Sequence, residues 1–377
     1  MQKIAIFYPY FMGGGAEAVG LWIIQALKNK YELTLFTLGE IHIEKLNSMY
    51  GTSISNEDIK IKTILPKFVD ILCYLMMVKN NNVKMLFFHL LIRIFKQNSH
   101  EYDLVISAYN AMDMGQKGIQ YIHWIKVLEG KPFHRKISTF SHEQLLNNIS
   151  IANSYCVADN VNKHYGINAN VVYPPVVIDT PDIPWIDKEY AFICSGRIVE
   201  PKQPHKVIKI LKLVRERGFD IKLHITGGGG GFYEWKYTNL VKKMVRENSS
   251  WITLHENLPY EEYIKVLANC KYGIHFKKEP FGISIAEMVK AGAIPFVRNE
   301  GGQVEIVGEN NEELFFNTEE EAVEKIIAVL SSSAKQNKLL QSLTTQRNLF
   351  STQRFMSEIN DIVTSFFDPK VTINTTN

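Results

Sequence analysis

The chain has 377 residues, of which 46% are apolar and 21% are charged. This composition is that of an ordinary soluble globular protein, and it excludes disordered, collagen-like and coiled-coil chains. The length exceeds the usual size of one domain, so two packed domains are expected. A formal net charge of +3 is too small for binding nucleic acid through bulk positive charge, so no nucleic-acid partner is expected.

The first half of the chain alternates strand-like and helical patterns. An apolar run at 3–8 leads into glycines, and residues 16–29 have helical periodicity. Further strand-like runs follow at 32–38, 59–65, 102–108, 119–123 and 149–157. Such alternation is typical of a mainly parallel sheet flanked by helices.

Prolines 174, 175, 181 and 184 predict a stiff linker, after which the alternation restarts. Strands are expected at 190–196, 220–227, 251–256, 271–276, 293–298 and 313–317. Helices are expected at 204–218, 232–248, 260–270, 283–292 and, without a break, from 318 to about 367. The pattern predicts two doubly wound α/β domains around a cleft, with ligands bound at the carboxyl ends of the strands.

Residues 60–96 form a basic and apolar block. They include seven basic residues and one acidic residue, a net charge of +6. One interpretation is a set of amphipathic helices that pack on the sheet and expose a solvated basic face. The other is a surface that rests on anionic lipid or grips a phosphorylated lipid acceptor.

The motif EPFGISIAEMVKAGAIPFV places two acids in a mainly apolar setting. Pro280 and Gly282 put Glu279 in a turn, and they predict a helix that begins near Ile283. The first N–H groups of such a helix lack partners within it and carry the positive end of its dipole, which suits a diphosphate. Glu287 has apolar neighbours, where a carboxylate is costly to bury unless a ligand such as a ribose binds it. Two solvated surface acids are the alternative.

Two cations follow the strand at 190–196, in SGRIVEPKQPHK. Arg197 can bind phosphate oxygens with two N–H groups, and Lys202 can act on them as a point charge. Together they would neutralise a diphosphate leaving group without a metal. The alternative is a structural salt bridge. The sequence contains no D-x-D triplet, so the ligands for a catalytic divalent metal are missing and none is expected.

Two glycine runs follow strands. FMGGGAEAVGLW places Gly14 and Gly15 in a flexible loop that opens a helix, where backbone can approach a phosphate or a sugar closely. It also contains a loose G-x-G-x-x-A dinucleotide fingerprint, although four residues separate it from the strand. In the second run, at 225–231, Gly227 is expected to line the cleft.

These motifs resemble one family. GGGAE, GR-x4-K, and E-x-F-G-x4-E followed by G-A-x-P are similar to the retaining glycosyltransferases of family 4, which have the GT-B fold. The later motifs are most similar to mannosyltransferases that elongate dolichol-linked or polyprenol-linked glycans. The resemblance implies two Rossmann-like domains facing a central cleft. Residues 1–175 would form an acceptor-side domain with helices at about 350–367 packed on it, and 186–349 would bind the nucleotide-sugar.

The resemblance also implies roles for single residues of the second domain. Glu279 would hold hydroxyls of the donor sugar near its anomeric carbon, and Glu287 would bind the ribose. Backbone amides would be offered to the sugar and phosphate by Phe281, Gly282 and Ile283.

The remaining implied roles concern both domains. Arg197 and Lys202 would clamp the diphosphate, and Leu258 would lie beside the base. From the first domain, Gly14 and Gly15 would approach the diphosphate. His123, at the end of the strand 119–123, matches a histidine that faces the cleft near the reacting centre. A packed structural histidine is the alternative for His123.

The expected activity is transfer of a hexose, with retention, from a nucleotide-sugar of the UDP-glucose or GDP-mannose type. The acceptor would be a glycan or a polyprenol-linked lipid in polysaccharide or glycoconjugate biosynthesis, domain closure would assemble the site, and no cofactor is expected. A nucleotide-sugar epimerase or hydrolase of the same fold and a non-catalytic module that binds nucleotide-sugar or polysaccharide are the alternatives. A dinucleotide-dependent dehydrogenase is less favoured.

The location follows from cysteine usage and from apolar runs. Four cysteines without regular spacing fit free thiols in a reducing cytoplasm. The N-terminus lacks the pattern of a secretory signal, and no stretch of about 20 residues is free of charge. We expect a cytoplasmic protein, with residues 60–96 as the candidate for peripheral contact with an anionic inner membrane.

Overall fold

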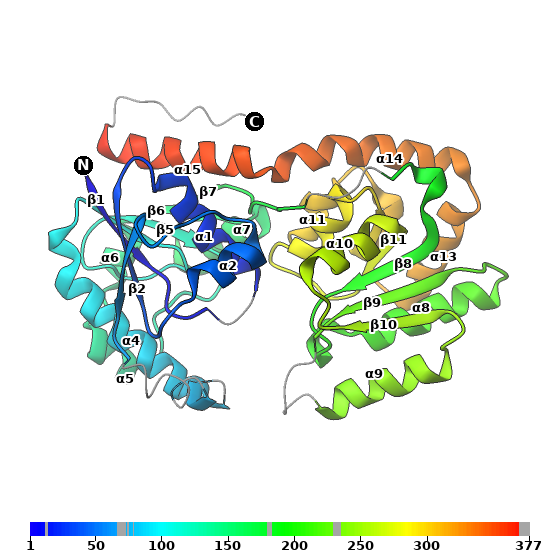
Figure 1. Ribbon diagram of the computed structural model, residues 1–377, viewed down its shortest axis with the longest axis horizontal. Coiled ribbons are helices and arrows are strands. Elements are labelled where there is room, and N and C mark those ends of the chain that lie inside the picture. Colours follow the sequence, from blue (N-terminus) through cyan, green and yellow to red (C-terminus); the bar gives the residue numbers. More distant parts are fainter. Residues whose placement is uncertain are drawn as a thin grey trace. The chain divides into compact units, whose positions relative to one another are not determined.

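The computed structural model describes residues 1–11, 14–65, 73, 75–77, 79–178, 183–228 and 235–368. The chain divides into two compact units (Figure 1). Unit 1 comprises Met1–Pro175 and Thr352–Asn377, and unit 2 comprises Val176–Ser351. Some residues used in the sequence predictions lie outside the described ones: Gly13, Lys67, Asp70, Pro181 and most of the second glycine run.

Unit 1 is built on a parallel seven-stranded sheet with the order β3-β2-β1-β4-β5-β6-β7. Its strands are β1 (Lys3–Phe7), β2 (Glu32–Thr37), β3 (Ile59–Thr63), β4 (Leu104–Ser107), β5 (Ile119–Ile122), β6 (Ile149–Ala152) and β7 (Ala169–Val171). The chain starts in the middle of the sheet, builds outward to β3 and then crosses to β4. This is a doubly wound order, and it places the switch point between β1 and β4.

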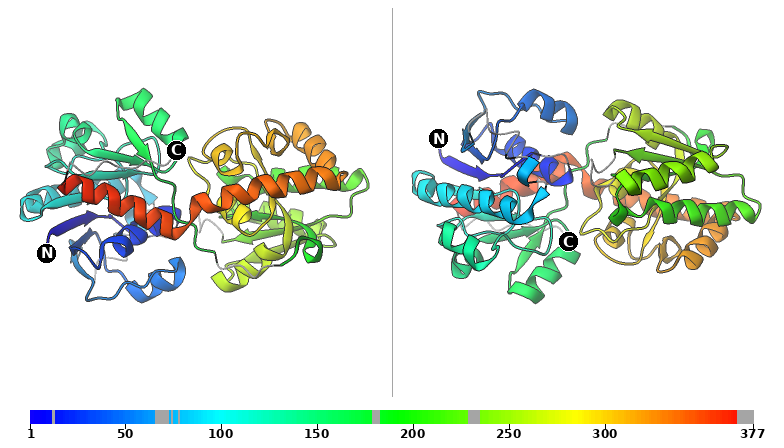
Figure 2. Two further views of the ribbon diagram at one scale, coloured as in Figure 1. Left: turned by 90° about the horizontal axis from the view of Figure 1, so that it is seen from above. Right: turned by 90° about the horizontal axis from the view of Figure 1, so that it is seen from below.

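Helices cover both faces of this sheet. They are α1 (Gly15–Leu27), α2 (Ile43–Tyr50), α4 (Asn81–Asn98), η1 (Ser99–Glu101), α5 (Pro132–Ser138), α6 (His142–Leu146), α7 (Tyr155–Tyr165) and α15 (Thr352–Phe367). Figure 2 shows α15 in front in one view and α4 in front in the opposite view. The C-terminal helix is tied to α1, because Asn360 Nδ2 donates to the carbonyl of Ala26 at 3.1 Å.

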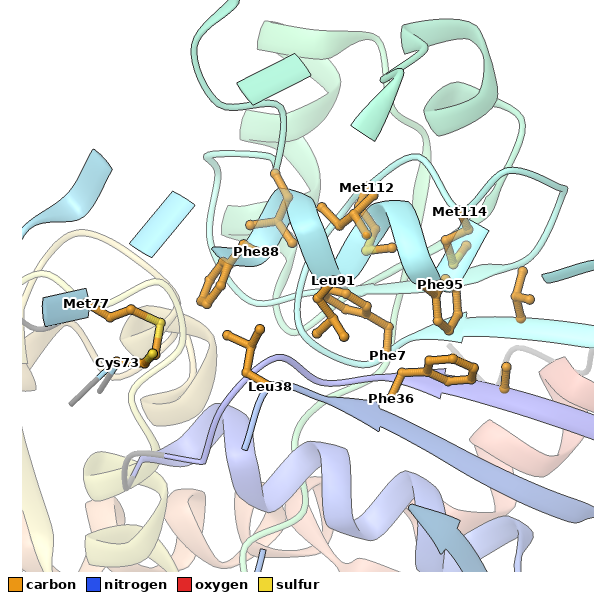
Figure 3. Packing of buried hydrophobic residues seen from close by; sticks show 14 residues of the cluster. Phe7, Phe36, Leu38, Cys73, Met77, Phe88, Leu91, Phe95, Met112 and Met114 are labelled. Atoms are coloured by element: carbon orange, nitrogen blue, oxygen red, sulfur yellow. The ribbon is translucent and has the colours of Figure 1, made fainter. Parts of the chain in front are cut away.

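The periodicity of α4 explains how it packs on the sheet. Phe88, Leu91 and Phe95 recur at helical spacing and are fully buried. The Phe95 ring packs edge-on against Phe7 of β1 and Phe36 of β2, with ring centroids 5.6 and 5.1 Å apart. Figure 3 shows these side chains converging on the sheet, with Cys73 and Met77 at the margin of the cluster.

Unit 2 contains a second parallel sheet, six-stranded, with the order β10-β9-β8-β11-β12-β13. Its strands are β8 (Glu189–Ser195), β9 (Lys222–Gly227), β10 (Ile252–Glu256), β11 (Cys270–His275), β12 (Ile294–Arg298) and β13 (Phe315–Phe316). The order again reverses next to the first strand, here β8, so the second half of the chain repeats the architecture of the first.

The helices of unit 2 also cover both faces of its sheet, with α10 and α11 on one side and α8 and α9 on the other (Figure 1). The α-helices are α8 (Pro204–Glu216), α9 (Trp235–Glu247), α10 (Tyr260–Asn269), α11 (Ile283–Lys290), α12 (Gln303–Val307), α13 (Glu319–Leu330) and α14 (Ser333–Arg347). Short 3-10 turns complete the unit: η2 (Trp185–Asp187), η3 (Glu200–Lys202), η5 (Glu312–Leu314) and η6 (Asn348–Phe350).

Two of the predicted elements are wrong in extent. The strand expected at 149–157 ends at Ala152, because the Ser154 hydroxyl accepts a hydrogen bond from the Val157 N–H and caps α7. The tail expected to be one unbroken helical stretch is divided into α13, α14 and α15. Ser332 caps α14 in the first break, and η6 occupies the second.

None of the four cysteines forms a disulfide. Across the part of the chain that the structure describes, no helix combines the length and the apolar character needed to span a bilayer.

Candidate active site

The predicted residues of unit 2 gather at one edge of its sheet. The strands β8, β9, β10 and β11 are parallel, so the segments that follow them leave from the same edge. These segments carry Arg197 and Lys202 after β8, Gly227 at the end of β9, Leu258 after β10, and Glu279 after β11. This is the edge at which doubly wound sheets bind their ligands.

The backbone of Glu279 is fixed by a residue that the motif did not reveal. Its N–H donates to Gln303 Oε1 at 2.8 Å. The Gln303 amide nitrogen in turn donates to the carbonyls of Lys277 and Arg298, both at 3.1 Å. Because Gln303 is fully buried and bonded at both ends, it holds the turn before α11 in one conformation.

The Glu279 carboxylate lies among three donors. Lys202 Nζ is 2.5 Å from its Oε1, His275 Nε2 is 3.1 Å from the same oxygen, and Lys277 Nζ is 3.3 Å from Oε2. Only 8% of the Glu279 surface is exposed. Burial alone would raise the pKa of Glu279, but the His275 hydrogen bond and the Lys202 charge lower it to about 2. The carboxylate is therefore ionised across the physiological range.

His275 forms a hydrogen bond with Glu279 from the end of β11. The ring is buried at the end of β11, and burial lowers its pKa below the ordinary value. A neutral ring can donate only through the protonated nitrogen, so the contact with Glu279 requires the proton on Nε2. The sequence offered one signal for this residue, a polar side chain directly after the run Tyr272–Ile274.

Arg197 stands apart from this ion-pair network. Its side chain is exposed, and among the described residues it forms no ion pair. It borders a small pocket of about 10 Å³, room for about one water molecule, that is also lined by Ser195, Gly196, Lys202 and His275. A diphosphate could reach these cations only at the mouth of the pocket.

Gly227 has a packing role that its motif did not specify. A Cβ on this residue would lie 2.0 Å from the carbonyl oxygen of Gly196, at a φ of +152°. The Gly196 N–H donates to the Thr226 carbonyl at 3.0 Å, and the Ile198 N–H donates to Gly228 at 2.8 Å. The missing side chain therefore lets the ends of β8 and β9 approach closely, which fixes the backbone beside Arg197.

The N-terminus of α11 presents free donors. Gly282 caps the helix at a φ of +115°, and its carbonyl accepts from the N–H groups of Ile285 and Ala286. In the described part of the chain, the N–H groups of Gly282, Ile283 and Ser284 have no acceptor. The preceding Phe281 is buried, with its ring 5.7 Å from that of Phe350. These donors without acceptors, on a loop anchored by Phe281, are of the kind that suits an anion.

Glu287 lies one turn further along α11 and is partly buried. The Tyr263 hydroxyl, on α10, donates to its Oε2 at 2.6 Å. Burial raises the pKa of Glu287 to about 7, against the opposing effect of that hydrogen bond. The residue is therefore not a solvated surface acid. Tyr263 is a second supporting residue that the sequence motifs did not indicate.

The glycine loop of unit 1 is held by a tyrosine. The Gly14 N–H donates to the Tyr50 hydroxyl at 3.0 Å, and that hydroxyl donates to Glu17 Oε2 at 2.9 Å. Gly15 begins α1, and the Glu17 carboxylate is buried in its first turn. Burial and the nearby Glu17 charge raise the pKa of Tyr50, so it remains a neutral donor. Neither the burial of Glu17 nor its contact with Tyr50 was predicted from the sequence.

His123 is packed inside unit 1. Its Nε2 donates to the Ala108 carbonyl at 3.0 Å, and its ring lies 4.9 Å from the ring centroid of Tyr121. Burial lowers the pKa of His123 to about 4, so the ring is neutral at physiological pH. One ring nitrogen is thus engaged by backbone, and the other is an acceptor.

Among the described residues, no group of three or more histidine, cysteine, aspartate or glutamate side chains has the geometry of a metal site.

Solved structures with a similar arrangement identify the fold. Anabaena HepE, solved in complex with UDP and glucose, matches with a TM-score of 0.69 at 15% identity, over 97% of this chain and 100% of that one. WaaG, a glycosyltransferase involved in lipopolysaccharide biosynthesis, matches with a TM-score of 0.66 at 14% identity, over 96% and 99%. A glycosyltransferase from Rickettsia africae gives 0.66 at 17% identity, over 97% and 99%. The fold is GT-B, which confirms the expected fold class.

A family model matches the second half of the chain. Residues 179–344 match the model of the family described as Glycosyl transferases group 1. The second half of the chain is therefore similar to the group 1 glycosyltransferases, as its motifs predicted. The human protein GDP-Man:Man(3)GlcNAc(2)-PP-Dol alpha-1,2-mannosyltransferase is 26% identical over 204 residues. That match covers 49% of this chain and 42% of the human protein, so the chain spans less than half the length of this relative.

Proposed function

We propose that the protein is a retaining hexosyltransferase that works without a metal ion. It takes the sugar from a nucleoside diphosphate sugar bound by unit 2 and transfers it to a glycan or lipid-linked acceptor bound by unit 1. The observation that carries this proposal is the ion pair between Lys202 and Glu279 at the carboxyl edge of the second sheet. A cation for the diphosphate and a carboxylate for the sugar hydroxyls are held side by side there.

The chemistry assigned to the site is electrostatic. When the bond from the anomeric carbon to the leaving oxygen breaks, negative charge grows on the diphosphate. Arg197, Lys202 and the free N–H groups at the start of α11 are the groups that would stabilise this charge. Glu279, ionised and fixed by His275 and Gln303, would accept hydrogen bonds from the sugar hydroxyls and hold the anomeric carbon in place. We assign no general base.

The transfer is tested by following the donor with and without an acceptor. We expect slow or no loss of a nucleotide-sugar alone and rapid loss when a glycan or polyprenol-linked acceptor is added. Loss of the sugar to water at the same rate in both cases would identify a hydrolase, and a change of sugar stereochemistry without transfer would identify an epimerase. Binding with no reaction under any condition would identify a non-catalytic module.

Two nucleotide-sugars are candidates for the donor. The human relative is named for GDP-mannose, and HepE is solved with UDP and glucose. We expect one of UDP-glucose and GDP-mannose to raise the melting temperature by several degrees when present at about 100 times its Kd, since a ligand at that excess stabilises the folded state by about 2.7 kcal/mol. A thermal-shift screen of both nucleotide-sugars, with UDP, GDP and ADP, identifies the donor nucleotide. A response to neither sugar nor nucleotide would contradict the assignment of the donor to unit 2.

Donor affinity is expected to depend on pH through Glu287. A ribose would donate its hydroxyls to the ionised carboxylate, whereas the free protein holds this proton up to a pKa of about 7. Binding should therefore release a proton below about pH 7, and affinity should fall by up to about tenfold for each unit of pH below that value. Above it, affinity should be constant.

Calorimetry with the intact nucleotide-sugar between about pH 5.5 and 8 measures this effect, because a diphosphate diester does not titrate there. Glu287→Gln is the test variant, and it should bind weakly with no pH dependence. Glu262→Gln, on α10 but exposed and paired with Lys265, is the matched control and should behave like the parent. An unchanged affinity in Glu287→Gln would argue against the ribose role.

A further inference from the structure

The helices α4 and α5 of unit 1 are neighbours (Figure 1). They share an apolar groove that the function proposed above does not use. The groove has a volume of about 230 Å³ and is lined by Asn82, Val83, Leu86, Lys131, Phe133 and His134. The two helices are joined at this point, because His134 Nε2 donates to the Asn82 carbonyl at 3.2 Å. The Phe133 side chain projects outward and is 63% exposed, an unusual position for a large apolar residue.

Positive charge surrounds this groove. We define the α4–α5 surface by the lining residues above, with Leu90, Arg93, Arg135 and Lys136. Residues 79–98 contain no acidic residue, and the only one at 126–136 is Glu129, whose Oε2 lies 2.7 Å from His142 Nε2. No cation of the α4–α5 surface has a carboxylate partner among the described residues. Its four positive charges, on Arg93, Lys131, Arg135 and Lys136, are therefore uncompensated.

The rest of the basic block is different. Lys60 pairs with Glu32, Lys62 pairs with Glu101, and Lys96 pairs with Asp113. The structure therefore divides the block at 60–96, which the sequence presented as one region of charge. The cations of β3 and Lys96 of α4 are paired with acids, whereas Arg93 of α4 and the cations of α5 have no acidic partner among the described residues.

We propose that the α4–α5 surface binds the face of an anionic lipid bilayer. Phe133 and Leu90 enter the boundary between headgroups and acyl chains, and the surrounding lysines and arginines contact lipid phosphates. Charge complementarity selects this occupant, because an apolar groove within an uncompensated cationic surface matches a layer that is anionic outside and apolar within. The inference stands without the proposed transfer, and it would bring unit 1 to the place where a lipid-linked acceptor resides.

The test is co-sedimentation of the full chain with phosphatidylcholine vesicles, with and without about one third phosphatidylglycerol. We expect binding to the anionic vesicles alone. Neutralising two cations, in Lys131→Gln/Lys136→Gln, should lower the partition coefficient about 25-fold, at about fivefold for each cation. The matched control Lys60→Gln/Lys62→Gln removes the same charge from exposed positions of the same unit, and it should bind within about twofold of the parent.

The apolar contribution is tested in the same assay. Phe133→Ala should lower binding at least about fivefold, and Ile186→Ala, which truncates an apolar side chain 79% exposed in unit 2, should not. All of these side chains are exposed, so the variants should keep the melting temperature of the parent and its shift with nucleotide-sugar. Those two readouts separate a failure of this inference from a failure of the proposed donor site.

Several results would overturn the inference. They are equal binding to neutral and anionic vesicles, absence of binding to both, and equal losses in the two lysine pairs. Sedimentation velocity of the protein without lipid provides a further test. Self-association of the parent that Phe133→Ala abolishes would show that a second copy of the chain, and not a bilayer, covers the α4–α5 surface.

Discussion

Glu279→Ala is expected to lower kcat by about two to three orders of magnitude. The carboxylate accepts from His275, Lys202 and Lys277, so its removal leaves two ammonium groups and a buried imidazole without their common partner. It also removes the acceptor proposed for the sugar hydroxyls, an interaction of the preorganised kind whose loss has effects of this size. Initial rates of transfer at saturating donor measure the change.

The control for this variant lies on the same edge of the sheet. Glu300 is half exposed and pairs with Lys278, so Glu300→Ala removes an equivalent charge from a surface ion pair. It should retain the parent rate, since such pairs contribute little. Glu279→Gln should be nearly as impaired as Glu279→Ala, because an amide presents only one acceptor oxygen and no charge to Lys202. Transfer by Glu279→Ala at close to the parent rate would sink the proposed assignment.

Lys202→Ala is expected to lower kcat/KM by about two to three orders of magnitude. Under the proposed function this ammonium group neutralises charge that develops on the leaving diphosphate, and no other described cation reaches Glu279 Oε1. Lys202→Arg should recover part of the loss, because the positive charge returns with a different reach. Steady-state kinetics at several donor concentrations provides the measurement.

A second readout separates charge from folding in this variant. Lys202 is one of the groups that lower the pKa of Glu279 to about 2, so its removal should raise that pKa and move the acidic limb of the rate profile to higher pH. The control Lys278→Ala, in an exposed pair with Glu300, should leave both the rate and the profile unchanged. A Lys202→Ala enzyme with parent kinetics would leave the diphosphate role without support.

The sequence motifs located the site because parallel strands end at a common edge. Arg197, Lys202 and Glu279 follow strands that are adjacent in the sheet, and this alone predicted that they would lie together. The sequence did not show that Lys202 and Glu279 contact each other directly. It offered a salt bridge as an alternative to a phosphate role, and the structure contains the pair with both residues still at the site.

The residues that support the site could not be predicted from sequence patterns alone. Gln303 contacts the Glu279 N–H from 24 residues away, and Tyr263 contacts Glu287 from the preceding helix. Such contacts depend on how α10, α11 and α12 pack, which neither periodicity nor spacing encodes. The strand predicted at 149–157 is too long because Ser154 caps the following helix. Serine is a favourable N-cap, so the sequence contained this signal, but the prediction followed the apolar pattern instead.

The Lys202–Glu279 ion pair has a consequence for the end of a reaction cycle. In the ligand-free protein each group satisfies the other, so Lys202 itself has little net attraction for stray phosphate. A ligand that carries both a diphosphate and a sugar compensates the two groups at once. After transfer of the sugar, a bare nucleoside diphosphate would still bind Lys202, and the nearly buried Glu279 carboxylate would lack its ion pair with that lysine. Re-formation of the pair would then drive the spent nucleotide out, and the site would favour turnover over product inhibition.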